Sequence, residues 1–190
     1  PKSVTVIDDS AFESCTAMTT LTLDADSQLQ KIKTQAFYNC VALSSSIVLP
    51  ESIMELHPQA FLSCKLLSGV TFENPAESNL IWIGYQCFSG CTAIASDIEF
   101  PDNLKEVEYN AFDSCSSLKS ISFSAKSELI SIAKSAFSGC SSLSGIINFP
   151  ASMGGLLGEL GAVDEKGILG ESAFNGCTNL QGITFHANIK

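Results

Sequence analysis

Short runs in which apolar and polar residues alternate recur along the whole chain. Each run has two large apolar residues separated by one spacer, as in the LTL, VTF, ISF and ITF segments at residues 21–23, 70–72, 121–123 and 183–185. A period of two places alternate side chains on opposite sides of the backbone, which is the pattern of a half-buried strand. The pattern therefore predicts a short strand at each run.

A pentapeptide containing phenylalanine and cysteine precedes each predicted strand. It is AFESC at residues 11–15 and returns as AFYNC, AFLSC, CFSGC, AFDSC, AFSGC and AFNGC. An apolar residue stands three positions after each terminal cysteine. The alanine, cysteine and following apolar residue are spaced as on one face of a helix, so we predict a short helical or 3₁₀ turn here. The terminal cysteines are Cys15, Cys40, Cys64, Cys91, Cys115, Cys140 and Cys177.

The spacing between these cysteines makes the chain a repeat protein. Successive cysteines lie 25, 24, 27, 24, 25 and 37 residues apart, and every second repeat inserts one residue and ends its strand on proline. A unit of about 24 residues cannot bury its apolar edge alone, whereas stacked units share one continuous core. We predict a single α/β repeat solenoid over residues 1–190, with about seven coils of short strand plus helical turn. The longest spacing indicates an insertion at about residues 151–167, and the mid-pattern start indicates a piece of a longer chain.

The combined motif resembles a known family. A pentapeptide of the AFxxC type followed by LxxIxF is similar to the BspA-type leucine-rich repeat, with Cys87 in place of the usual alanine. The resemblance covers nearly the whole chain in seven copies. It implies a leucine-rich-repeat solenoid and a cell-surface or secreted protein that adheres to, or binds, a host or cell-surface protein or glycan. It supplies no catalytic residue and no cofactor.

Charge and hydropathy exclude other function classes. The chain has 10 basic residues against 20 acidic ones, a net charge of −10, and none of the basic residues is arginine. Nucleic-acid and anionic-membrane binding both depend on clustered cations, so neither is expected. The apolar runs also fall short of the roughly 18–20 residues needed for membrane insertion.

The eight cysteines allow four interpretations: disulfides, a zinc site, catalytic nucleophiles or packing. Stacked side chains in neighbouring coils point the same way, which disfavours disulfides. Zinc needs convergent ligands, whereas Cys87 and Cys91 form the one close pair and the two histidines fall in distant coils. A residue type repeated in every coil serves something that every coil needs, so we favour a ladder of buried thiols.

The outward positions of the predicted strands are the candidate binding surface. They are small, rich in hydroxyl groups and mildly acidic, and they lack the aromatic and arginine anchors of tight protein interfaces. Trp82 and Tyr85 lie elsewhere, and Trp82 falls between two inward positions, so it is a further candidate contact residue. Without a ligand on this face, the solenoid would be an architectural spacer in a larger surface protein. The candidate residues are Thr20, Thr22, Asp24, Ser46, Thr71, Glu73, Asp97, Glu99, Ser120, Ser122, Asn148 and Thr184.

Overall fold

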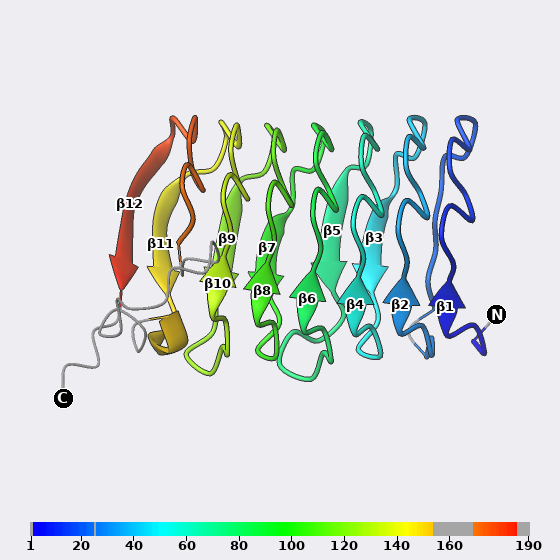
Figure 1. The fold of residues 1–190 in the computed structure, drawn as a ribbon, viewed down its shortest axis with the longest axis horizontal. Coiled ribbons are helices and arrows are strands. Elements are labelled where there is room, and N and C mark those ends of the chain that lie inside the picture. The colour runs from blue at the N-terminus through cyan, green and yellow to red at the C-terminus, as the bar shows by residue number, and fades with distance from the viewer. Residues whose placement is uncertain (1, 25, 154–168, 186–190) are drawn as a thin grey trace.

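The chain winds into a solenoid whose parallel strands form two opposite sides (Figure 1). The computed structural model describes residues 2–24, 26–153 and 169–185. One side is a six-stranded parallel sheet of two-residue strands, in the order β1-β2-β4-β6-β8-β10. Ile132 forms a further parallel bridge to Leu169. The strands are β1 (Val6–Ile7), β2 (Lys31–Ile32), β4 (Glu55–Leu56), β6 (Trp82–Ile83), β8 (Glu106–Val107) and β10 (Ser131–Ile132).

The opposite side carries the longer strands that the alternating pattern predicts. They pair in parallel as β3–β5, β7–β9 and β11–β12. Each pair joins a repeat that ends on proline to the repeat that follows it, so the pairing follows the alternation in the sequence. The strands are β3 (Ser46–Leu49), β5 (Gly69–Phe72), β7 (Asp97–Phe100), β9 (Ser120–Phe123), β11 (Gly145–Phe149) and β12 (Leu180–Phe185).

A serine hydroxyl occupies the junction between two of these pairs. The Ser96 hydroxyl donates to the Val70 carbonyl at 3.2 Å and accepts from the Val70 N–H at 3.3 Å. Ser45 accepts in the same way from the Leu21 N–H. These hydroxyls satisfy backbone groups that a neighbouring strand would otherwise bond, as buried backbone polar groups require. The breaks between pairs therefore leave these backbone groups hydrogen-bonded.

The pentapeptides are tight turns, which corrects the expected helical turns and the α/β class. Residues with positive φ stand just before each pentapeptide and at its fourth position; Gln59 and Ser63 have φ of 60° and 64°. A left-handed residue on either side of the Ala-Phe pair prevents a run of helical residues. The helix among the described residues is the short 3₁₀ segment Ala151–Met153. The fold is a β-solenoid.

The number of coils is also lower than seven. From β1 to β10 the described chain completes five turns of the solenoid. The number of pentapeptides exceeds this number of turns by two, because the pentapeptides at residues 136–140 and 173–177 follow β10. The proposed insertion at 151–167 lies largely outside the described residues, apart from the 3₁₀ segment Ala151–Met153.

The interior is built from a stack of phenylalanine rings, one from each pentapeptide. The centroids of consecutive rings lie 5.1–5.3 Å apart and their planes are nearly parallel. The rings of the middle coils are buried. Offset stacking of this kind adds to the free energy of burial. The ladder consists of Phe12, Phe37, Phe61, Phe88, Phe112, Phe137 and Phe174.

The terminal cysteines form a parallel ladder of free thiols, as expected for a packing role. Each thiol from Cys40 onward donates to the carbonyl oxygen of the pentapeptide phenylalanine of the preceding coil, at 3.1–3.2 Å. Burial raises the pKa of the Cys64 thiol to about 12. Cys15 is exposed and Cys177 is half-buried, because they lie in the outermost described coils. Cysteine thus fills a small apolar site and also satisfies a backbone acceptor.

Candidate binding faces

The long-strand face carries the predicted site residues and is small-featured and polar. The predicted residues of β3, β5, β7, β9 and β11 stand next to buried ones and project outward, whereas in β12 Thr184 stands between the exposed Ile183 and Phe185. Thr20, Thr22 and Asp24 lie in a segment of the first coil that forms no strand, which corrects the strand predicted at residues 21–23, and Glu73 follows β5. All twelve are exposed or half-buried.

Neighbouring coils hold these polar side chains in cross-strand pairs. Asp97 is opposite Ser120, whose hydroxyl donates to the Asp97 carboxylate at 2.7 Å. Asn148 is opposite Thr184, and their side chains are hydrogen-bonded. Part of the hydrogen-bonding capacity of this face is therefore used within the face itself.

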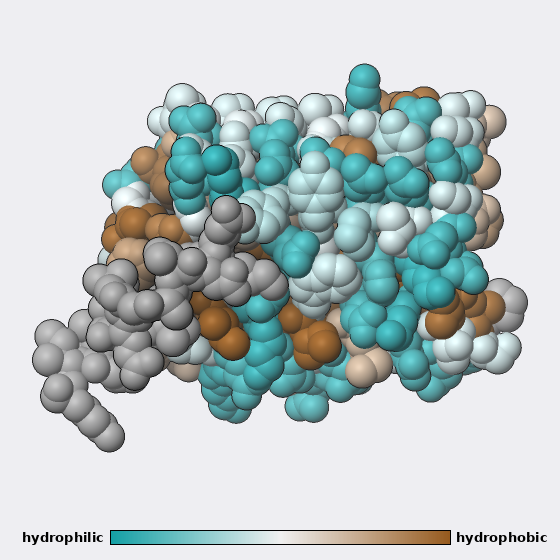
Figure 2. Space-filling model, in the orientation of Figure 1, coloured by the Kyte–Doolittle hydropathy of each residue, from teal (hydrophilic) through white to brown (hydrophobic). Residues whose placement is uncertain are grey.

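The short-strand face has a more varied chemistry, and the sequence analysis did not consider it as a binding surface. Figure 2 views this face and shows apolar and weakly polar patches among the charged groups. Its outward column changes from cation to anion to aromatic within three coils. In register, the column reads Lys31, Glu55, Trp82 and Glu106, and the next position is the buried Ser131. In the sequence, this column could have been identified as the position that immediately precedes each inward Ile, Leu or Val.

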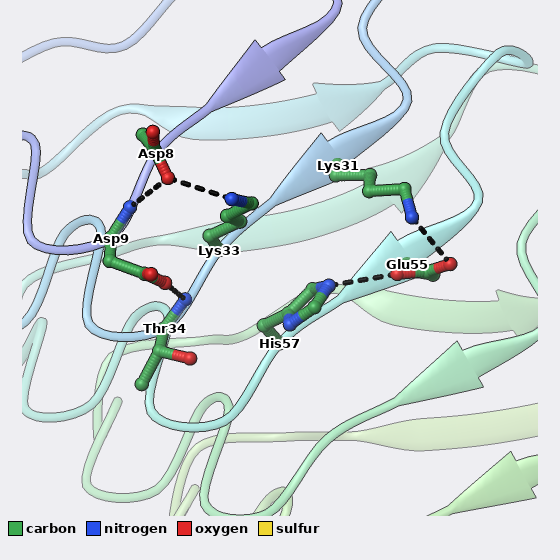
Figure 3. Close-up of polar contacts among 7 residues, drawn as sticks. All are labelled: Asp8, Asp9, Lys31, Lys33, Thr34, Glu55 and His57. Carbon is green, nitrogen blue, oxygen red and sulfur yellow. Dashed lines mark hydrogen bonds and ion pairs between the residues drawn. The ribbon is translucent and has the colours of Figure 1, made fainter.

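Ion pairs link neighbouring coils on this face (Figure 3). Lys31 contacts Glu55 at 3.0 Å, and Lys33 contacts Asp8 at 2.9 Å. His57 Nε2 lies 2.8 Å from the same Glu55 carboxylate. The pKa of Glu55 is lowered mainly by the hydrogen bond from Lys31, and to a smaller extent by the contact with His57. Side chains of the first three coils are therefore held in fixed positions across the sheet.

Trp82 lies at the centre of this face and is half-buried rather than fully exposed. Its indole meets the His57 ring edge-on, with centroids 5.3 Å apart and an interplanar angle of 79°. Beside it is a shallow recess of about 450 Å³ lined by Glu55, Ile81, Trp82, Lys105, Glu106 and Glu108. The recess offers an aromatic surface, carboxylates and exposed aliphatic carbon at one place.

A ladder of glutamine side chains links consecutive turns of the solenoid. Gln35 donates to Gln59 at 2.9 Å, and Gln59 donates to Gln86 at 3.0 Å. These residues have positive φ, and the ladder connects three consecutive turns.

In the described residues no group of three or more His, Cys, Asp or Glu side chains could hold a metal ion. The described faces present charged groups, hydrogen-bonding groups and an aromatic ring.

Comparison with protein families identifies the repeat. The model of the BspA type leucine rich repeat region matches six copies, over residues 1–78, 75–155 and 164–190. No curated protein matches the chain. Within the described residues, no helix is long and apolar enough to cross a membrane.

Solved structures share the fold at low sequence identity. The pneumococcal vaccine antigen PcpA is 23% identical with a TM-score of 0.68, over 88% of this chain and 40% of that one. The T. pallidum leucine-rich repeat protein TpLRR is 23% identical with a TM-score of 0.65, over 88% of this chain and 71% of that one. A leucine-rich cell surface protein of Faecalibacterium prausnitzii A2-165 is 21% identical with a TM-score of 0.57, over 90% and 48%. The chain thus spans about half the length of the last relative.

Proposed function

We propose, from the premise that this chain belongs to the BspA-type leucine-rich repeat family, that it is a non-catalytic binding module. The observation that carries the proposal is the contrast between columns of the solenoid. Inward columns repeat the same residue types in every turn, whereas the outward column from Lys31 to Glu106 changes character at each turn. A scaffold that keeps its interior and varies its surface suits recognition of a partner through an extended face.

The proposed setting is the cell surface or the extracellular medium, and the proposed partner is a host or cell-surface protein or glycan. One relative in the fold comparison is described as a leucine-rich cell surface protein, which supports the setting. The net charge of −10 suits a soluble acidic surface. Binding would use many contacts spread over consecutive turns, with affinity gained from their number.

An architectural spacer is the second candidate. It is favoured by the long-strand face, where small polar side chains such as Ser120 and Asp97 bond to each other. A spacer would hold other domains away from the cell without a ligand of its own. The two candidates differ in whether saturable binding exists at all.

A binding screen separates the candidates. The purified chain is tested against panels of host extracellular proteins and of glycans, and each hit is titrated to saturation. Hits are repeated with a long-strand-face variant carrying Thr71→Ala, Asp97→Asn and Glu99→Gln, and with a short-strand-face variant carrying Glu106→Gln and Glu108→Gln. Saturable binding that one face variant loses and the other keeps supports a binding module. An absence of saturable binding across both panels favours the spacer.

A further inference from the structure

We propose that the Trp82 recess is the docking point for a lysine or arginine side chain on an extended segment of a protein partner. The inference rests on the proposed binding function and deepens it by naming the site and the chemistry of its partner. It stands on the register of the short-strand sheet, on the charges around the indole and on the shape of the recess.

Sheet register places the indole between two carboxylates. Glu55 and Glu106 are the in-register partners of Trp82 on the two neighbouring strands, β4 and β8. Adjacent strands lie about 4.8 Å apart, so a group seated on the ring is within reach of both acids. Tryptophan is the side chain that attracts a cation most strongly through its ring face. Aromatic surface and negative charge therefore act on the same bound group.

The charge in the recess favours a cation. Three carboxylates line it, from Glu55, Glu106 and Glu108, against the single ammonium of Lys105. Lys105 is itself paired with Glu128 at 2.6 Å. Glu55 already bonds Lys31 and His57, which holds its carboxylate beside the ring. A ligand that brings a positive charge complements this arrangement, whereas an anionic ligand would be repelled.

The apolar part of the recess suits the stem of a basic side chain. Ile81 is 40% exposed and lines the recess next to Trp82. Lysine and arginine place their methylene stems on apolar surface while their charged ends remain near acids and water. A neutral sugar would stack on the ring and donate hydroxyl hydrogen bonds to the carboxylates, but it would leave their negative charge uncompensated. A basic peptide segment is therefore the occupant that matches the ring, the carboxylates and the exposed aliphatic carbon together.

Intrinsic fluorescence gives a direct test because Trp82 is the single tryptophan of the chain. The whole chain is titrated with a synthetic peptide of alternating glycine and lysine, and in parallel with the same peptide carrying glutamate for lysine. We expect a saturable change in emission with the lysine peptide and none with the glutamate peptide. A panel of neutral oligosaccharides is titrated in the same way.

Matched variants separate a built site from general attraction to an acidic protein. Glu106→Gln with Glu108→Gln should weaken binding of the lysine peptide about fivefold. Asp97→Asn with Glu99→Gln removes the same charge from the long-strand face and should leave the affinity within about twofold. Trp82→Ala, followed by calorimetry, should weaken binding about fivefold, and Trp82→Phe should restore part of it. Thermal melts establish that each variant is folded.

Three results overturn the inference. They are an emission change with neutral sugars but not with the lysine peptide, equal weakening by the two charge variants, and unchanged affinity in Trp82→Ala. Failure here is distinct from failure of the proposed function. Partners found in the binding screen that depend on the long-strand face would keep the function while removing this site.

Discussion

The interior of the solenoid and its short-strand face follow opposite rules, although both are columns of residues in register. Phe37, Phe61 and Phe88 occupy one interior position in consecutive turns, and their rings stack. On the outside, Lys31, Glu55 and Trp82 occupy one position in consecutive turns, each with different chemistry. Inside, each residue must fit the identical residue above and below it. Outside, solvent imposes no such match, so this is the region where a specific function can be encoded.

Alkaline pH should cause the largest effect on the interior column. Burial raises the pKa of all six buried thiols, those of Cys40, Cys64, Cys87, Cys91, Cys115 and Cys140. Below pH 9 these thiols are protonated in both the folded and the unfolded state. Above pH 9 the thiols of the unfolded chain lose their protons before those of the folded protein. Stability is therefore intact below about pH 9 and falls up to about pH 12, by about 1.4 kcal/mol per thiol per pH unit.

Denaturant melts from pH 8 to pH 10 measure this loss. The double variant Cys64→Ala with Cys140→Ala is the control, since it removes two of the six groups and should flatten the slope. A stability that is independent of pH over this range, or a slope unchanged in the control, would contradict the thiol ladder.

Truncating a central ring should cause the next largest effect. Phe112 stacks on rings from both neighbouring turns and is buried, so Phe112→Ala should lower the free energy of unfolding by about 3–5 kcal/mol. The matched control is Phe12→Ala, because Phe12 is 41% exposed and stacks on one side. Phe12→Ala should lower the free energy of unfolding clearly less than Phe112→Ala does. Equal losses measured by chemical denaturation would disprove that the central, buried ring contributes more than the exposed one.

A single thiol should contribute less than a ring. Cys115→Ala removes one sulfur atom and its hydrogen bond to the Phe88 carbonyl oxygen, so we expect a loss of about 1–2 kcal/mol. Cys15→Ala is the comparison, because Cys15 is exposed; it should change stability by less than about 0.5 kcal/mol. Urea denaturation of both variants gives the two values, and a larger loss at Cys15 would reverse the assignment of roles.

The outer column should affect stability least. Lys31→Met removes a partly exposed ion pair with Glu55 and should cost less than about 1 kcal/mol. Because Lys31 is the main cause of the lowered pKa of Glu55, the same variant should raise that pKa. Titration of the Glu55 carboxyl carbon by NMR measures the shift directly. An unchanged titration curve would show that Lys31 does not hold this carboxylate in solution.

The repeat and the long strands could be predicted from the sequence because their period is visible in every copy. The helical turns were predicted wrongly, because the spacing of Ala, Cys and Leu also fits a tight turn. Left-handed residues such as Gln59 and Ser63 decide between the two, and neither residue type signals that conformation strongly. Asn39, Gly90 and Gly139, which stand at the fourth position of their pentapeptides, were the residues that indicated a left-handed conformation.

The short-strand face was missed for a different reason. Two-residue strands such as β6 are too short to show alternation, so Trp82 could be placed only by register with Glu55 and Glu106. Sequence reasoning put Trp82 between inward positions, and the edge-on contact with His57 explains why it is half-buried. Contacts between residues about 25 positions apart decide the properties of this face.

Titration of the native chain with Ellman's reagent at pH 8 tests the division between a uniform interior and a functional exterior most directly. The account expects fast reaction at the exposed Cys15, slower reaction at the half-buried Cys177, and reaction of the six buried cysteines only after unfolding in guanidinium chloride. Rapid reaction of several thiols in the folded protein would contradict it, because the cysteine column would then be an accessible surface rather than the interior of the solenoid.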